Sequence, residues 1–159
     1  MRRPAATAAL IALALLLAAC APRTPPLPER PPDLLLIEAG GLHLPGESTG
    51  VCWPDGATEH CIPAPSPNFP AYHRLPEGSQ IEVLVEGEGA PDVLKLVLYD
   101  DYYFVSSVAS TQFDAPGADE PVIWVPDVPP GPYVLSVSAE WRSGAQVGRV
   151  YAVRITAAP

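Results

Sequence analysis

The stretch that most constrains the fold of this chain is residues 131–141, which read GPYVLSVSAEW. Successive side chains of an extended chain point to opposite faces, and here apolar residues recur at every second position. One face carries Tyr133, Leu135, Val137, Ala139 and Trp141. This period of two is typical of a half-buried β-strand, so the sequence predicts a long strand with one face against an apolar core.

Several other segments are typical of strands, and none after residue 33 has helical spacing with caps. The expected strands are 33–38, 80–86, 93–99, 102–108, 122–125 and 148–155, with a further hairpin around the two central cysteines. The inward residues are predicted to be Ile81, Val83, Val85, Leu94, Leu96, Leu98, Tyr151, Val153 and Ile155. Seven or eight short strands predict an all-β, antiparallel β-sandwich.

The last predicted hairpin resembles a known class of domain. The pattern Pro130-Gly131-Pro132-Tyr133-x-Leu135-x-Val137-x-Ala139, followed by a Gly-rich turn, is similar to the final hairpin of immunoglobulin-like and fibronectin-III-like domains of exported bacterial proteins. Tyr133 stands where such folds place a tyrosine corner. The resemblance covers roughly residues 48–156 and includes small exported domains without a known activity. It implies an Ig-like sandwich over residues 33–159 and transfers no catalytic residue.

The N-terminus has the features of an export signal. Arg2 and Arg3 precede an apolar run over residues 5–19, and these 15 residues are too few to span a bilayer, which needs roughly 20. The run ends in Leu17-Ala18-Ala19-Cys20, which resembles a bacterial lipobox. We therefore expect residues 1–19 to be removed and Cys20 to carry the lipid (palmitate among its acyl chains) that anchors the protein in the cell envelope.

Alternatives to this anchor remain open. The leader could be an ordinary secretion signal in which Cys20 is a bystander, and Arg2-Arg3 could belong to a twin-arginine signal. Ala21 follows the cysteine, and by the same resemblance its identity favours the outer membrane in a bacterium with two membranes. In a bacterium with one membrane we expect the outer face of the cell membrane.

A proline-rich stretch separates the expected anchor from the domain. Residues 20–32 contain six prolines and almost nothing apolar beyond the cysteine, which predicts an extended, polyproline-like tether. The whole chain carries 18 acidic and 9 basic residues, for a net charge of −9. Such a surface repels phosphate backbones, so no nucleic-acid partner is expected.

Cys52 and Cys61 are an even pair in an oxidising compartment, which predicts a disulfide. Between them Trp53-Pro54-Asp55-Gly56 has the composition of a β-turn, with proline second and glycine fourth. A zinc or redox pair with His60 is the alternative, but the spacing is far from CxxC.

The sequence offers little for catalysis or metal binding. The three histidines, His43, His60 and His73, are not spaced as metal ligands even with Glu59 added, and Ser48 and Ser66 lie in no nucleophile motif. The carboxylates that could bind calcium do not follow a calcium-loop pattern. These carboxylates are Asp100 with Asp101, and Asp114 with Asp119 and Glu120. We expect no enzyme activity, no metal and no cofactor.

The most unusual local composition is that of residues 99–104. The six residues are Tyr99, Asp100, Asp101, Tyr102, Tyr103 and Phe104. Aromatic faces beside carboxylates can bind sugars or cations. Alternatively, the aromatics pack in the sandwich and the aspartates form a turn. Trp53, Trp124 and Trp141 could join an aromatic platform only if they face outward, and Trp141 is predicted to face inward.

Together these features predict a lipid-anchored module outside the cytoplasm that binds an envelope protein or supports the envelope structurally, without catalysis. The alternative is a lipoprotein that binds a small ligand or glycan through residues 99–104. A hydrolase is the third hypothesis and has the least support, because no nucleophile and base can be paired from the sequence.

Overall fold

The computed structural model describes residues 27, 29–37, 41, 43–55, 58–63, 72–87, 89–101 and 103–157. These residues form eleven β-strands and no helix. The strands are β1 (Asp33–Ile37), β2 (His43–Pro45), β3 (Glu47–Asp55), β4 (Thr58–Pro63), β5 (His73–Pro76), β6 (Ile81–Glu86), β7 (Val93–Tyr99), β8 (Ser107–Asp114), β9 (Val122–Trp124), β10 (Gly131–Glu140) and β11 (Gln146–Thr156). No helix in the described part of the chain is long and apolar enough to cross a membrane.

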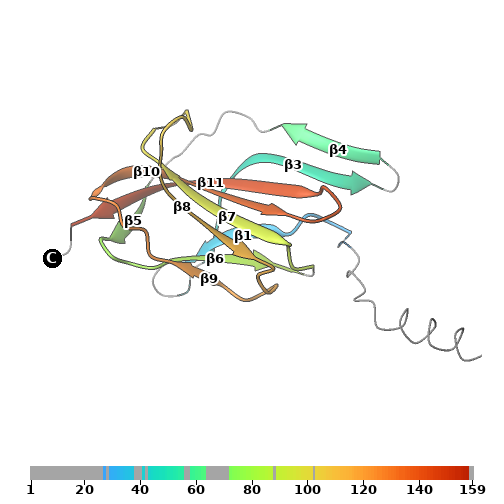
Figure 1. Ribbon diagram of the computed structural model, residues 1–159, viewed down its shortest axis with the longest axis horizontal. Coiled ribbons are helices and arrows are strands. Elements are labelled where there is room, and N and C mark those ends of the chain that lie inside the picture. The colour runs from blue at the N-terminus through green and yellow to red at the C-terminus, as the bar shows by residue number, and fades with distance from the viewer. Residues whose placement is uncertain are drawn as a thin grey trace, which may run out of the picture.

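The strands form two sheets that face each other as a sandwich (Figure 1). The smaller sheet has the order β2-β1-β6-β9, and the larger has the order β4-β3-β11-β10-β7-β8. Neighbours in both orders are antiparallel, whereas β5 pairs in parallel with the end of β11. The predicted all-β sandwich is therefore confirmed, although it has more strands than the seven or eight expected.

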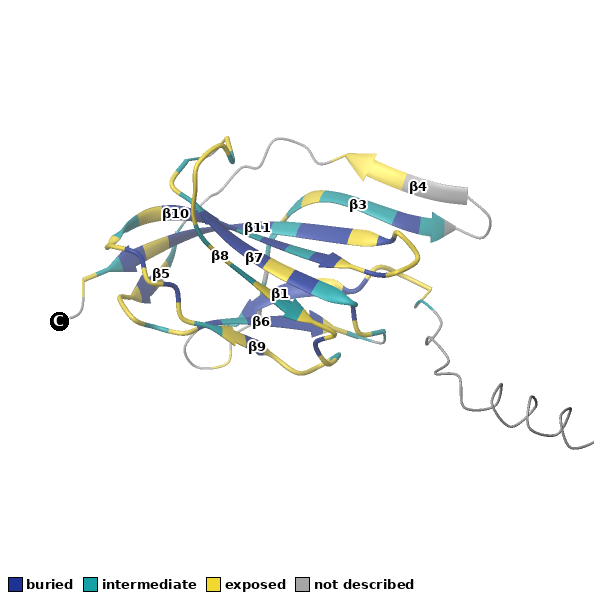
Figure 2. Ribbon diagram, viewed as in Figure 1, coloured by how far each residue is buried: buried dark blue, intermediate teal, exposed yellow. Residues whose placement is uncertain are grey.

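The core lies between the two sheets, where the inward faces are buried (Figure 2). Leu36 of β1, Val83 of β6, Leu96 of β7 and Leu135 of β10 have no exposed surface. Each such side chain contributes about 1.5–3 kcal/mol relative to an exposed position. The inward residues predicted from the alternation in 81–85, 94–98, 133–141 and 151–155 are all buried, so these predictions are confirmed.

One predicted strand is wrong. Residues 102–108 were expected to be extended, but β8 begins only at Ser107, and residues 103 and 104 belong to a turn. The apolar residues of this stretch therefore lie mainly in a loop, because the chain reverses direction there to enter β8. The strand that follows it, β8, is mostly polar and was not predicted.

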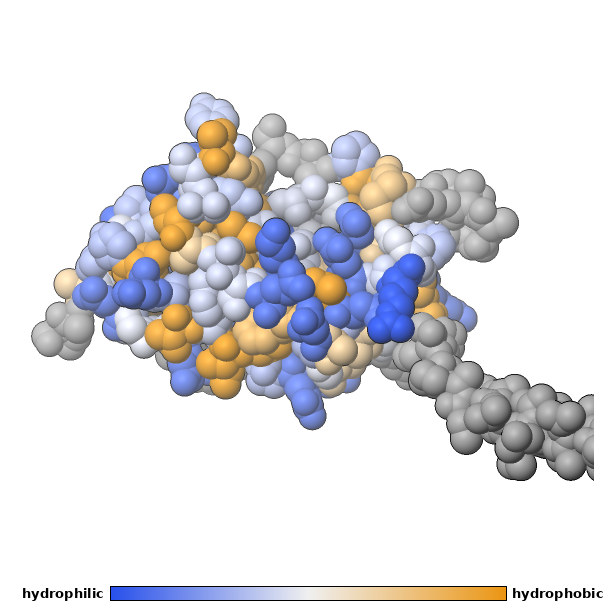
Figure 3. Space-filling model, viewed as in Figure 1, coloured by the Kyte–Doolittle hydropathy of each residue, from blue (hydrophilic) through white to orange (hydrophobic). Residues whose placement is uncertain are grey.

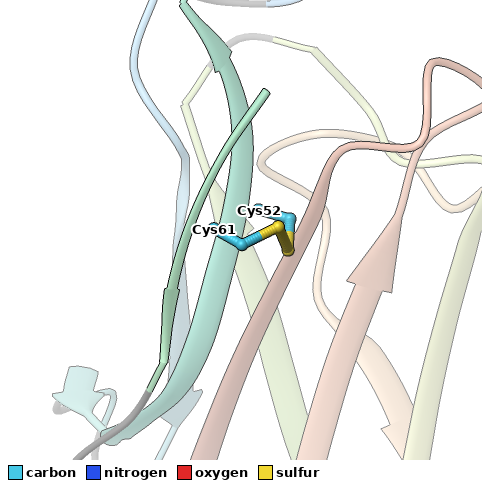
Figure 4. Close-up of a disulfide and its surroundings, with 2 residues drawn as sticks. All are labelled: Cys52 and Cys61. Atoms are coloured by element: carbon cyan, nitrogen blue, oxygen red, sulfur yellow. A yellow bond between two sulfur atoms is a disulfide. The ribbon is translucent and has the colours of Figure 1, made fainter. Parts of the chain in front are cut away.

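The disulfide joins the neighbouring strands β3 and β4 (Figure 4). Cys52 and Cys61 are direct register partners, with their Cα atoms 4.0 Å apart. The predicted bond is confirmed, but the predicted turn over residues 53–56 is wrong. Trp53 and Pro54 continue β3, and the hairpin reverses only between Asp55 and Thr58, which are the last paired residues.

Three buried aromatic side chains make contacts that stabilise the sandwich. Trp141 packs edge-on against Trp53 at 5.1 Å between ring centroids, and its indole N–H donates to the carbonyl of Gly89 at 2.9 Å. Tyr151 of β11 donates its hydroxyl to the carbonyl of Leu34, so it ties the larger sheet to β1. Because Trp53 and Trp141 are buried, they join no exposed aromatic platform.

Candidate binding loop between β7 and β8

The predicted aromatic and acidic cluster lies in the loop that joins Tyr99, the last residue of β7, to Ser107, the first residue of β8. The Asp100 N–H donates to the carbonyl of Ser106 at 3.3 Å, which closes the base of the loop. Figure 1 shows this loop projecting from a part of the domain away from the point where the chain enters β1. The loop therefore points away from the N-terminal side of the domain.

Asp101 organises the inside of this loop. One carboxylate oxygen accepts hydrogen bonds from the N–H groups of Tyr103 at 2.7 Å and Val105 at 3.3 Å, and the other accepts from Ser106 at 3.0 Å. Desolvation raises the pKa of Asp101, but together the backbone N–H groups of residues 103–106 lower it by more than this, so the pKa lies below its ordinary value. The carboxylate is therefore held ionised by the loop backbone and serves the loop's own structure.

The aromatic residues of the loop divide into a base and a tip. Tyr99 and Phe104 are half-buried and pack edge to face, with ring centroids 5.3 Å apart and an interplanar angle of 85°. Phe104 adopts a left-handed conformation with φ of 57°, which turns the chain sharply. Beyond this base, Tyr103 is 87% exposed and Val105 is 80% exposed. Tyr102 lies outside the described residues.

The loop projects from the surface of the domain (Figure 3). The cavity at its base has a volume of about 40 Å³ and is lined by Tyr72, Asp100, Asp101, Pro132, Tyr133 and Val134. Ligand pockets usually measure roughly 300–1,000 Å³, so this cavity is too small for a sugar ring. The arrangement offers an exposed aromatic and an exposed aliphatic side chain on a rigid turn.

Tyr133, which lines the cavity at the base of the loop, makes a hydrogen bond within its own segment. Its hydroxyl donates to the carbonyl of Pro129, four residues earlier, at 2.7 Å. Burial, followed by the negative charge of Asp100, raises the pKa of Tyr133, so the hydroxyl remains a hydrogen-bond donor over the neutral range. The Arg154 guanidinium lies 4.8 Å from the centre of the Tyr72 ring, a cation–π contact at the edge of the cavity.

The structure places the other candidate residues apart from this loop. His43 and Ser48 lie in β2 and β3, His60 and Glu59 in β4, and His73 in β5. Within the described residues, no three His, Cys, Asp or Glu side chains come together as metal ligands would. Cys20 and Ser66 lie outside the described residues, so the expected lipid site has no structural account.

Two acidic residues at and after the end of β8 have structural partners. Asp119 accepts a hydrogen bond from the Gly87 N–H at 3.0 Å, and Asp114 accepts one from the Gln112 amide at 2.8 Å. These contacts, like those of Asp101, show carboxylates that hold loops and strand ends in place.

One residue of the loop was missed from the sequence. Val105 was not among the candidate residues, although it is as prominent at the tip as Tyr103. The turn that the sequence offered as an alternative at the two aspartates is present, and the bond from Asp101 to the N–H two residues later makes it an Asx turn.

Comparison with protein-family models, curated proteins and solved structures gives no match to this chain.

Proposed function

We propose that this protein is a lipid-anchored binding module of the cell envelope, which acts outside the cytoplasm through protein–protein contacts of the β7–β8 loop. It holds its domain on the membrane through Cys20 and presents the loop tip, Tyr103 and Val105, to a partner protein. No catalytic step is part of this role.

The anchor is supported by the sequence and by the disulfide. Leu17-Ala18-Ala19-Cys20 has the lipobox pattern behind a short apolar run, and two or more acyl chains hold a protein stably on a bilayer. Disulfides persist outside the cytoplasm, and the bond between Cys52 and Cys61 fits that location.

An Ig-like assignment of the domain is supported by its strand pairing. β1, β6 and β9 pair in the order of Ig strands A, B and E, while β8, β7, β10 and β11 pair in the order C′, C, F and G. The Tyr133 hydroxyl bond to Pro129 has the geometry of a tyrosine corner at the start of strand F. The disulfide differs, because it lies within one sheet, whereas antibody domains join the two sheets.

The exposure of Tyr103 and Val105 on a preorganised turn is the observation that carries the proposed function. A rigid turn loses little entropy on binding, and exposed tyrosines are frequent anchors of protein interfaces. The alternative, a glycan or small ligand, would have to bind on the open face of Tyr103, because the cavity at the base of the loop measures only about 40 Å³.

The test is capture of partners from the envelope by tagged, full-length protein in mild detergent. The Tyr103→Ala/Val105→Ala variant should recover the partner at least about tenfold less well, because truncating a central interface anchor costs about 2 kcal/mol or more. Ile62→Ala is the control, since Ile62 is 69% exposed but lies on β4.

Equal recovery by all three proteins would overturn the role of the loop. A glycan array on the same proteins examines the alternative. Glycan binding that disappears in the double variant, without any protein partner, would favour the ligand-binding function.

A further inference from the structure

The larger sheet has an open edge at β8. Among the described residues β8 pairs only with β7, so one side of this strand has no neighbouring strand. Natural edge strands are usually protected by lysine, proline or a bulge. β8 contains neither lysine nor proline, and the single irregularity of the pairing lies at its start, next to Tyr99.

The hydrogen bonds at the end of β8 show which peptide groups face outward. The Ala115 N–H donates to the Asp92 carbonyl at 2.7 Å, and this contact continues the β7–β8 register. Hydrogen-bonded and non-hydrogen-bonded pairs alternate along an antiparallel ladder. The peptide groups of Ser110, Gln112 and Asp114 therefore point away from β7.

A groove runs along this open side. It has a volume of about 590 Å³ and is lined by Gln112, Phe113, Asp114, Pro116, Gly117, Glu120, Pro121, Val122 and Ile123. Phe113 is half-buried against the core, and Ile123 of β9 is 49% exposed. The groove thus lies between the edge strands of the two sheets and has an apolar floor.

The far wall of the groove is fixed before any partner binds. The Asp119 N–H donates to the Val85 carbonyl at 3.1 Å, and Asp119 accepts from the Gly87 N–H at 3.0 Å. The Glu120 side chain folds over Gly117, where a Cβ would lie 2.9 Å from its carboxylate. The wall therefore requires little ordering when an extended chain enters.

The charge of the groove indicates its occupant. Its lining includes the exposed carboxylates of Asp114 and Glu120 and no lysine or arginine. We propose that an extended, basic polypeptide segment of a partner protein adds as a strand to β8, with its backbone on Ser110, Gln112 and Asp114. This inference extends the proposed binding role to a second surface, next to the β7–β8 loop.

A second copy of this chain fits the edge less well. The chain carries a net charge of −9, and pairing two β8 strands would bring two acidic grooves together. Like charges across an interface disfavour association, whereas a basic segment is attracted to the groove.

The experiment uses synthetic peptides and full-length protein in non-ionic detergent. The probe is an eight-residue peptide that alternates valine and lysine, and the comparison peptide has glutamate in place of lysine. The basic peptide should bind and slow amide exchange at Ser110, Gln112 and Asp114 by about tenfold or more, because added hydrogen bonds protect these groups. The acidic peptide should not bind.

Two variants examine the two parts of the proposal. Gln112→Pro removes an outward N–H without removing a bond to β7 and should weaken peptide binding at least about tenfold. Asp114→Asn/Glu120→Gln removes the charge and should weaken binding while leaving the fold intact. Glu47→Gln/Glu77→Gln removes the same charge from β3 and from the turn after β5, neither of which lines the groove, and should have no effect.

Equal binding of both peptides, or protection that falls on other strands, would overturn the proposal. So would dimerisation in sedimentation that is abolished by Gln112→Pro, because a second copy would then occupy the edge. Because the peptides need no natural partner, failure here is distinct from failure of the Tyr103 and Val105 variants in envelope capture.

Discussion

At the scale of single residues, the Asp101 carboxylate stabilises the loop in which it lies. Its two oxygens bind three backbone N–H groups, so the loop has one preferred shape. Tyr103 and Val105 are exposed on a loop of that shape.

Acidification should therefore loosen the loop. Because the folded pKa of Asp101 is lowered, its contribution to stability is present above the ordinary aspartate pKa of about 3.9 and is lost as the pH falls through the folded value. The amide resonances of Tyr103 and Ser106 should titrate with a midpoint below that of an ordinary aspartate. Asp101→Asn should abolish this titration, while Asp127→Asn should leave it intact. A midpoint at or above the ordinary value would contradict the account.

Gly148 is required by a close approach between β11 and β3. The β3–β11 register shifts next to it, and a Cβ at this position would collide with the Thr49 hydroxyl. Gly148→Ala should lower the free energy of unfolding by about 1–3 kcal/mol, as overpacking usually does. Adding Thr49→Ala should restore most of the lost stability, because the remaining Cβ at position 49 would lie 3.5 Å from the new Cβ at position 148. Urea unfolding measures the stability of the single and the double variant. If the double variant is as unstable as the single variant, the contact with Thr49 is not the cause.

At the scale of elements, strands with one buried face were predictable and strands at an edge were not. In β10 and β7 the apolar residues alternate because one face meets the core, and the sequence shows that period directly. β8 is an edge strand with no fully buried residue, so its polar sequence has no such period. The aromatic residues 102–104 predict a strand, but the hydrogen bonds to Asp101 hold residues 103–106 in a loop.

The pairing of strands that lie far apart in the sequence could not be predicted either. The parallel pairing of β5 with β11 joins residues about 80 positions apart, as His73 opposite Val153 shows. The β3–β4 hairpin was expected with a tight turn at Pro54, whose lack of an N–H favours turns. Pro54 is instead accommodated in β3, beyond the residues that pair with β11.

The disulfide should matter most to β4. This outer strand of the larger sheet pairs only with β3 among the described strands, so the bond between Cys52 and Cys61 is its covalent support. Replacing both cysteines with serine should lower the free energy of unfolding by about 2–3 kcal/mol, the chain-entropy value for a loop of this length. Denaturant midpoints of the oxidised, reduced and double-serine proteins give the comparison. An unchanged midpoint would show that the hairpin is stable by itself.

At the scale of the whole molecule, the first described strand begins far from the proposed binding surface. The chain enters the domain at β1, and the β7–β8 loop projects from a part of the domain away from that entry (Figure 1). A partner bound at Tyr103 and Val105 therefore needs no contact with the part of the domain where β1 begins.

The anchor is tested by changing its attachment atom. Cys20→Ser should move the protein from the membrane fraction to the soluble fraction and abolish labelling by palmitate, because no thiol remains to be lipidated. The Cys52–Cys61 disulfide should be unaffected, which mass spectrometry of unreduced protein can verify. Continued membrane association after carbonate extraction would show that another feature holds the protein there.

Site-specific photocrosslinking in living cells tests the proposed binding role most directly. A photoreactive benzoylphenylalanine at position 103 should give one discrete adduct with an envelope protein, and the same group at position 62 should not. Adduct formation should decrease when Cys20→Ser releases the protein from the membrane. No adduct from position 103, or the same adducts from both positions, would contradict the proposal that this loop binds a protein partner.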